Sequence, residues 1–155
     1  MKPINQMKLE FKSLSSNEGF ARVAVASFIS SLDPTISEIA DIKTAVSEAV
    51  TNCIVHAYAD SIGIITIHTR IYENRRIIIT IRDKGCGIEN IEKAMEPLFT
   101  TKPQEERSGL GFSVMQSFTD KVKVRSKLGG GTSVTLEKIL SKKKNATDRG
   151  RSRKT

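Results

Sequence analysis

A chain of 155 residues with 38% hydrophobic residues is long enough for one compact domain whose core needs no disulfide or structural metal. The two cysteines, Cys53 and Cys86, are too few for a disulfide framework or a cysteine-type zinc site, and no apolar run approaches the roughly 20 residues that span a bilayer. These features exclude a disulfide-rich secreted scaffold and a membrane-spanning protein, and we expect a cytoplasmic location.

The net charge of +8 is concentrated in the C-terminal part of the chain. Residues 141–155 hold seven basic residues and one acidic residue, a net charge of +6, which leaves +2 for residues 1–140. Because this basic tail has no apolar residue beyond Ala146, it cannot pack, and we expect a disordered end beside a single folded domain. A contact of the tail with nucleic acid or a membrane surface stays open as the less favoured interpretation.

The first part of the chain predicts one strand and two helices. Residues 8–12 alternate in polarity and indicate a short strand. The pattern SSNE at residues 15–18 has the form of a capping box, in which serine and glutamate side chains satisfy free NH groups, so a helix is predicted to about Leu32. TISE at residues 35–38 repeats the box and opens a longer helix, to about Tyr58, whose apolar residues fall at helical spacing.

Four further segments alternate between apolar and polar residues and predict strands. They lie around residues 63–72, 77–81, 121–125 and 134–137. Each segment has one apolar and one polar face, which fits an antiparallel or mixed sheet with helices over a single face. A doubly wound parallel sheet is disfavoured, because its strands are apolar on both faces. We therefore predict an α/β fold, a two-layer sandwich with a mixed, mostly antiparallel sheet.

A polar pair, Glu48 and Asn52, lies in the longer predicted helix. The two residues are four apart and therefore one turn apart on the same face. A solvated stripe is the common fate of such residues, but neighbouring apolar residues place the pair at the edge of the core. An asparagine oxygen near a carboxylate suits a magnesium ion that takes further ligands from water and phosphates. Glu48 could then orient or deprotonate an attacking hydroxyl.

The segment RDKGCGI, residues 82–88, follows a run of isoleucines. Taken alone, Asp83, Gly85 and Gly87 indicate an ordinary turn, because an aspartate can bond to its own backbone two residues on. A functional interpretation requires a pocket, a metal site and a second pair of glycines elsewhere in the chain.

Such a pair follows an aperiodic loop. Residues 96–108 contain two prolines and mixed charges and are typical of a mobile loop that serves as a lid. Gly109 and Gly111 then open an amphipathic helix, where small residues let free backbone NH groups approach a phosphate and the helix dipole adds a favourable contribution. By themselves these glycines indicate only a flexible helix entry.

The motifs gain meaning from their order. E-x-x-x-N on a helix, D-x-G-x-G after a strand, a lid, G-x-G at a helix start and GGGT at residues 129–132 follow the order seen in the Bergerat-fold ATPases, the ATP domains of gyrase, mismatch-repair proteins, heat-shock chaperones and histidine kinases. This resemblance spans about residues 8–140. The segments NEGFARVAVASF, EAVTNCIVHAY, PLFTTKP and ERSGLGF more narrowly resemble the anti-sigma factor serine kinases of sporulating bacteria, the anti-sigma-F family.

The resemblance implies a role for each motif. Asp83 accepts a bond from the adenine amino group of ATP, and Gly85 and Gly87 let the backbone pass beneath the base. Asn52 holds Mg²⁺, and Glu48 is the catalytic base. The further nucleotide-binding residues implied are Thr100, Thr101, Lys102, Ser108, Gly109, Leu110, Gly111 and Thr132, with Thr132 closing the adenine pocket. Arg107 in the lid is assigned, ahead of Lys102, to neutralising charge on the transferring phosphoryl group, although either could be a solvated loop charge.

The resemblance also implies partners. Arg22 matches an arginine that contacts protein partners, although an exposed helix charge is the simpler interpretation, and His56 is assigned a structural or pocket-edge role. No separate phosphoacceptor helix is evident, which disfavours a two-component histidine kinase. We hypothesise a homodimeric anti-sigma factor that binds a sporulation sigma factor with ATP and phosphorylates a serine of an anti-anti-sigma factor. The alternatives are an ATP-gated binding module without phosphotransfer and a nucleic-acid-associated ATPase that uses the basic tail.

Overall fold

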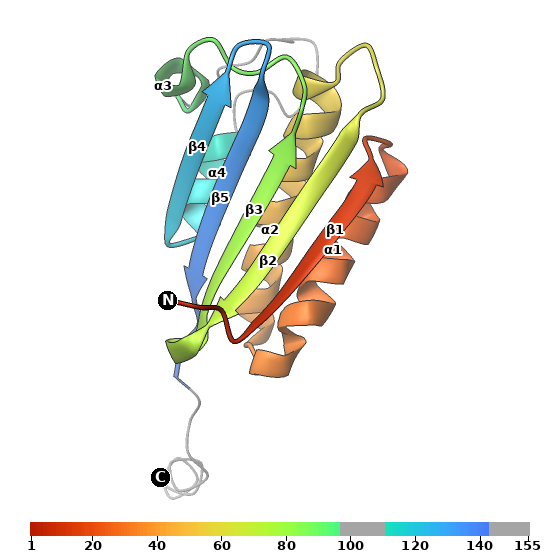
Figure 1. The fold of residues 1–155 in the computed structure, drawn as a ribbon. Coiled ribbons are helices and arrows are strands. Elements are labelled where there is room, and N and C mark those ends of the chain that lie inside the picture. The colour runs from red at the N-terminus through yellow and green to blue at the C-terminus, as the bar shows by residue number, and fades with distance from the viewer. Residues whose placement is uncertain (97–110, 143–155) are drawn as a thin grey trace, which may run out of the picture.

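The alternating segments form one five-stranded sheet, drawn face-on in Figure 1, in a computed structural model that describes residues 1–96 and 111–142. The strands are β1 (Asn5–Lys12), β2 (Ile64–Tyr72), β3 (Arg76–Asp83), β4 (Lys121–Lys127) and β5 (Gly131–Ile139). Their spatial order is β1-β2-β3-β5-β4, and all four pairings are antiparallel. Strand β1 begins earlier than the strand predicted at residues 8–12, and the other four strands lie where the alternation indicated.

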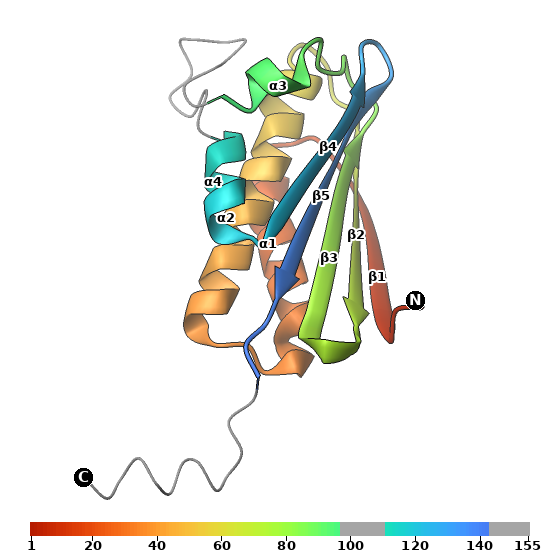
Figure 2. The same cartoon turned by 90° about the vertical axis from the view of Figure 1, so that its left-hand side faces the viewer.

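The helices cover one face of this sheet, as the side view in Figure 2 shows. They are α1 (Ser16–Ile29), α2 (Ile36–Asn52), α3 (Ile91–Ala94) and α4 (Gly111–Phe118), with 3₁₀ turns η1 (Ser30–Leu32) and η3 (Glu73–Arg75) and a π-helical turn η2 (Cys53–Ala57). The predicted two-layer α/β sandwich is therefore confirmed. None of the described helices is long and apolar enough to cross a membrane.

The core lies between the two layers. One row of apolar side chains crosses all five strands through the paired residues Leu9, Ile67, Ile81, Val134 and Val124. The three central members are at most 5% exposed. A slip of one residue in any pairing would turn this row toward solvent, so burial of the row fixes the register of the strands. The register in turn decides which residues lie side by side where the strands end.

Of the two predicted capping boxes, only the second is present. Glu38 N donates to Thr35 Oγ1 at 3.1 Å, and Thr35 N donates to Glu38 Oε1 at 2.9 Å. The prediction of a box at residues 15–18 was wrong: Ser15 has a helical backbone (φ −57°, ψ −31°), and its side chain makes no cap hydrogen bond. An N-cap residue needs an extended backbone to turn its hydroxyl toward the first turn of the helix.

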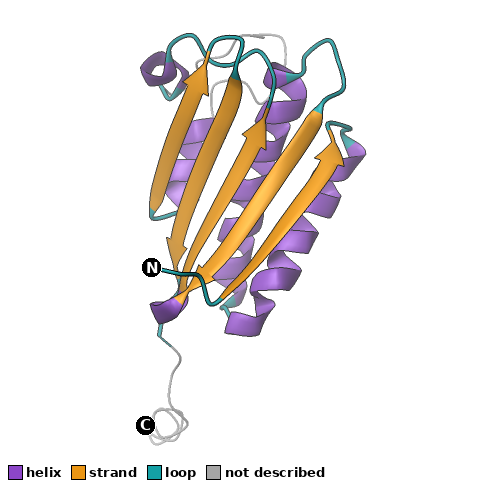
Figure 3. Cartoon of the chain, viewed as in Figure 1, coloured by secondary structure: helices purple, strands orange, loops and turns teal. Residues whose placement is uncertain are grey.

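The long helix ends close to Tyr58, as predicted, but its last turn is π-helical. The closing bond is donated by Tyr58 N to Cys53 O at 3.0 Å. The Tyr58 hydroxyl then donates to Ile64 O and accepts a bond from Lys84 N at 2.6 Å, which ties this turn to the loop after β3. In Figure 3 the end of α2, the loop after β3 and the β4–β5 turn gather at one end of the molecule, where the site lies.

Candidate functional site

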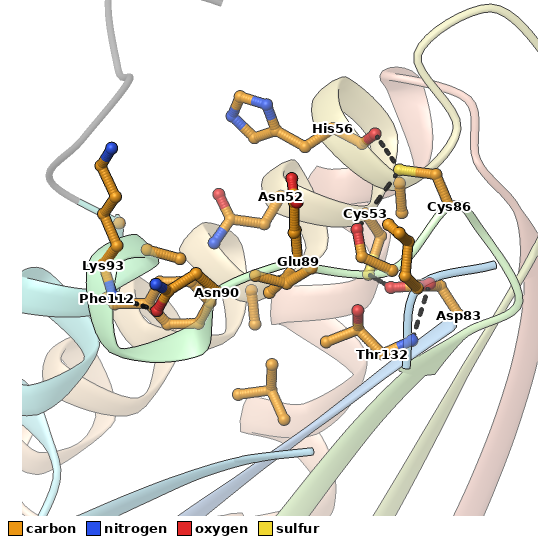
Figure 4. Close-up of a pocket in the computed structure, with 18 residues that line it drawn as sticks. Asn52, Cys53, His56, Asp83, Cys86, Glu89, Asn90, Lys93, Phe112 and Thr132 are labelled. Atoms are coloured by element: carbon orange, nitrogen blue, oxygen red, sulfur yellow. Dashed lines mark hydrogen bonds between the residues drawn. The ribbon is translucent and has the colours of Figure 1, made fainter. Parts of the chain in front are cut away.

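A cavity of about 640 Å³ opens at this end of the molecule, between the helices and the sheet (Figure 4). Its lining comes from the end of α2 and η2, the loop after β3, α3, the start of α4, the β4–β5 turn and β5. The volume falls within the range of pockets that enclose a small molecule. Segments far apart in the sequence thus converge on one binding-sized space.

Asp83, the last residue of β3, is the acidic side chain most deeply set in this cavity and is 9% exposed. Its Oδ1 accepts hydrogen bonds from Gly85 N at 3.0 Å and Thr132 N at 3.1 Å. Its Oδ2 accepts from Cys53 Sγ at 3.5 Å. The carboxylate is therefore held from three directions, by its own loop, by β5 and by η2, while it still lines the cavity.

The glycines after Asp83 are required by close contacts within the protein. A Cβ at Gly85 would lie 2.3 Å from Ala57 O, and one at Gly87 would lie 2.1 Å from Lys127 O. Gly87 also has a left-handed backbone, with φ +77°. Any side chain at either position would push the loop away from η2 or from the β4–β5 turn, and so would open the cavity wall.

Asn52, the last residue of α2, meets the start of α4 in the cavity. A Cβ at Gly111 would lie only 3.1 Å from Asn52 Nδ2 and 3.2 Å from its Oδ1. Glycine at the first residue of α4 therefore lets the amide lie against this helix end, and both residues line the cavity. Within residues 1–96 and 111–142, no group of three histidine, cysteine, aspartate or glutamate residues could hold a metal.

Glu48 lies one turn before Asn52 on α2 and is half-buried. It is not among the described residues that line the cavity. The structure thus brings Asn52 and Asp83 together in the cavity wall and leaves Glu48 beside them, outside that wall.

Thr132 completes the side of the cavity opposite η2. Its Oγ1 lies 2.8 Å from Ser126 Oγ, and that serine in turn accepts a bond from Ile88 N at 2.7 Å. The two hydroxyls join the β4–β5 hairpin to the loop after β3, so the position of Thr132 is coupled to the loop that follows Asp83.

Other predicted residues lie elsewhere. Arg22 projects from α1, its side chain is 45% exposed, and its Nη1 lies 3.6 Å from Glu18 Oε1. It does not line the cavity. Those that fall outside the described residues are Thr100, Thr101, Lys102, Arg107, Ser108, Gly109 and Leu110. Most of the basic tail, from residue 143 onward, also falls outside them.

Several lining residues were missed or given another role by the sequence reasoning. They are Cys53, Cys86, Glu89, Asn90, Lys93, Phe112 and Leu128. Cys53 and Cys86 are chain neighbours of the predicted Asn52, Gly85 and Gly87, and that proximity was the available signal. The residues of α3 gave none, because a short helix has no period to test. His56, for which a structural or pocket-edge role was predicted, lines the cavity from η2.

The sequence matches known proteins along most of its length. A family model described as a histidine kinase-like ATPase domain matches residues 13–138. An anti-sigma F factor of Caldanaerobacter subterraneus subsp. tengcongensis is 59% identical over 138 residues, which cover 89% of this chain and 96% of that protein. An anti-sigma F factor of Clostridium acetobutylicum is 56% identical over 134 residues, which cover 86% of this chain and 93% of that protein.

Solved structures share the fold at much lower identity. The RsbU and RsbW domains of a Mycobacterium tuberculosis protein superpose with a TM-score of 0.67 at 20% identity, covering 91% of this chain and 34% of that one. The catalytic domain of the histidine kinase ThkA gives a TM-score of 0.56 at 19% identity, covering 88% and 99%. The Bergerat ATP-binding fold predicted from the motifs is thereby confirmed.

Proposed function

Because this chain belongs to the anti-sigma F factors, within the histidine kinase-like ATPase domain family, we propose that it binds ATP in the cavity and, in that state, holds a sporulation sigma factor. We propose in addition that it transfers phosphate from ATP to a serine of an anti-anti-sigma factor. The cytoplasmic location expected from the sequence agrees with both partners.

The convergence of Asp83, Asn52, Thr132 and Gly111 on one cavity carries this proposal. Asp83 lines the cavity, and a carboxylate oxygen can accept a hydrogen bond from the amino group of adenine. The walls around it supply apolar surface from residues such as Ala49, which suits the flat face of a base.

Asn52 and the start of α4 fit the phosphate end of the nucleotide. The NH groups at the N-terminus of a helix favour an anion, and Gly111 leaves the space beside them open to the Asn52 amide. The asparagine oxygen is the ligand of this chain that would hold Mg²⁺, and phosphate oxygens and water would complete its coordination. When bound, Mg²⁺ neutralises negative charge on the phosphates.

Glu48 is proposed to act on the protein substrate. Its carboxylate would take the proton of the serine hydroxyl while the serine oxygen forms a bond to the γ-phosphorus and ADP leaves with the bridging oxygen. Arg107 is proposed to offset the negative charge on the transferring group. The serine comes from a separate protein.

One observation favours the simpler alternative, ATP-gated binding without phosphotransfer. Glu48 is half-buried and lies outside the described cavity lining. A base must come within hydrogen-bond reach of its proton in the reacting complex. If Glu48 never reaches the serine, ATP would serve only to stabilise the conformation of the chain that binds the sigma factor.

Helix α1 is the proposed surface for protein partners. Arg22 is exposed there, and two large apolar side chains of the same helix, Phe20 and Val23, are 54% and 56% exposed. Exposed apolar residues with an arginine are typical of protein interfaces. We propose that α1 contributes to partner binding and to a homodimer.

ATP-dependent capture of the sigma factor tests this function. The purified chain, with and without Mg-ATP, would be passed over immobilised sigma factor of sporulation, and calorimetry would measure Mg-ATP affinity separately. We expect capture that requires the nucleotide. If the chain binds ATP tightly but captures the sigma factor equally well with and without it, the proposed ATP dependence of sigma binding is refuted. If the chain does not bind ATP, the assignment of the cavity as an ATP site is refuted.

A further inference from the structure

The two oxygens of Asp83 have different partners. Oδ1 accepts two backbone NH groups, from Gly85 and Thr132. Oδ2 accepts from the thiol of Cys53, whose sulfur lies 3.5 Å away and 30 positions earlier in the chain. The two bonds to Oδ1 limit rotation of the carboxylate about its Cβ–Cγ bond, because the group is planar and both oxygens move together. The bond to Oδ2 adds a third restraint on that rotation, and it comes from a different element, η2.

Cys53 is well placed to donate a hydrogen bond to Asp83. It is the first residue of η2, is 4% exposed, and lines the cavity together with Asp83 (Figure 4). The Sγ of Cys53 is within hydrogen-bond distance of Asp83 Oδ2, and in a pair of a thiol and a carboxylate the thiol is the donor.

We infer that Cys53 is a positioning residue for base recognition: its S–H bond to Asp83 Oδ2 restrains rotation of the carboxylate and holds Oδ2 where it can also accept a hydrogen bond from the 6-amino group of adenine. The inference rests on the proposed ATP site and deepens it. A thiol is a weak donor, so it orients Oδ2 without exhausting that oxygen as an acceptor. Adenine and Cys53 then share one carboxylate oxygen, which has lone pairs for both.

A purely structural role is the competing explanation, since buried cysteine often behaves as a small apolar residue. The two roles differ in what they affect. Loss of packing would destabilise the fold and lower the affinity for every nucleotide equally. Loss of positioning would lower the affinity only for ligands that present an amino group to Asp83, and the affinity for a purine without that group would not change.

The test compares two nucleotides on matched variants. ATP and purine riboside 5′-triphosphate, which lacks the 6-amino group, would be titrated by calorimetry with Mg²⁺ into the parent chain, Cys53→Val and Cys53→Ser. Valine fills the site without a donor, and serine retains one. Circular dichroism and thermal melting check folding, and Cys53→Ala, which adds no volume, gives the same comparison if valine does not fit.

We expect the parent to prefer ATP and Cys53→Val to lose about three- to tenfold in ATP affinity, the range for one net hydrogen bond. Its affinity for purine riboside 5′-triphosphate should stay unchanged, and Cys53→Ser should keep the preference for ATP. An equal loss for both nucleotides, or none for either, would overturn the positioning role while leaving the ATP site standing. A parent chain that binds neither nucleotide would instead refute the proposed function.

Discussion

Replacement of Asp83 with asparagine should reduce ATP affinity through orientation as well as charge. Gly85 N and Thr132 N, 3.0 and 3.1 Å from Oδ1, are both donors, so an amide at this position must turn its oxygen toward them. Its NH₂ group then takes the place of Oδ2 and meets the adenine amino group donor against donor. The Cys53 thiol would face the same NH₂ group and lose its acceptor.

The expected cost follows from one lost hydrogen bond to a charged acceptor. Such bonds contribute about 1.5–3 kcal/mol, which corresponds to roughly a 10- to 150-fold rise in Kd. ITP presents an oxo group where ATP presents an amino group, and the NH₂ group of Asp83→Asn can donate a hydrogen bond to that oxo group. The ratio of ITP affinity to ATP affinity should therefore be higher for Asp83→Asn than for the parent. Calorimetry with Mg-ATP and Mg-ITP measures both quantities.

Asp33→Asn is the matched control. Asp33 is exposed, lies in the connection before α2, at the opposite end of that helix from Asn52, and already has the left-handed backbone that asparagine tolerates. This control should leave both affinities unchanged. Parental ATP affinity in Asp83→Asn, with an unchanged ratio of ATP to ITP binding, would remove Asp83 from the base site.

Three further variants or reagents address other parts of the molecule. Thr35→Ala should cost about 1 kcal/mol in urea unfolding because it breaks a formed capping box, whereas Ser15→Ala should cost much less; equal losses would contradict the cap assignments. Arg22→Glu should weaken sigma-factor binding in a pull-down while Mg-ATP affinity stays at the parental value, and unaltered sigma binding would make Arg22 an ordinary surface charge. Iodoacetamide should label the exposed Cys86 and leave the buried Cys53 unlabelled. Mg-ATP should slow the labelling of Cys86, because this residue lines the cavity; an equal labelling rate with and without Mg-ATP would count against ATP binding in this cavity.

Local patterns predicted most of the fold. Alternation placed Ile67, Ile81 and Val134 on the buried face, and the paired strands use that face. The capping sequence at Thr35 formed as expected, whereas the similar sequence at Ser15 did not. The difference lies in the backbone at each helix start: Ser15 has helical angles, whereas Thr35 is extended, with φ −68° and ψ 161°. A four-residue sequence pattern does not contain that information.

The site was predictable as a set of motifs and less so as a set of contacts. Asn52, Asp83 and Thr132 meet in one cavity, as the order of the motifs implied. The bond from Cys53 to Asp83 was not predicted, because helical spacing placed that cysteine among ordinary core residues. It depends on how the π-helical end of α2 packs over β3, which is a tertiary property. The position of Glu48 outside the cavity lining is a tertiary property for the same reason.

Single-turnover transfer of labelled γ-phosphate from ATP to a purified anti-anti-sigma factor tests the proposed kinase activity most directly. It would be measured for the parent and for Glu48→Gln, with ATP-dependent capture of the sigma factor recorded beside it. We predict transfer by the parent, a fall of roughly 10²- to 10⁴-fold in the variant, the usual contribution of a general base, and capture retained in both. A parent that captures the sigma factor with ATP but transfers no phosphate, or a variant with full transfer, would contradict the catalytic assignment.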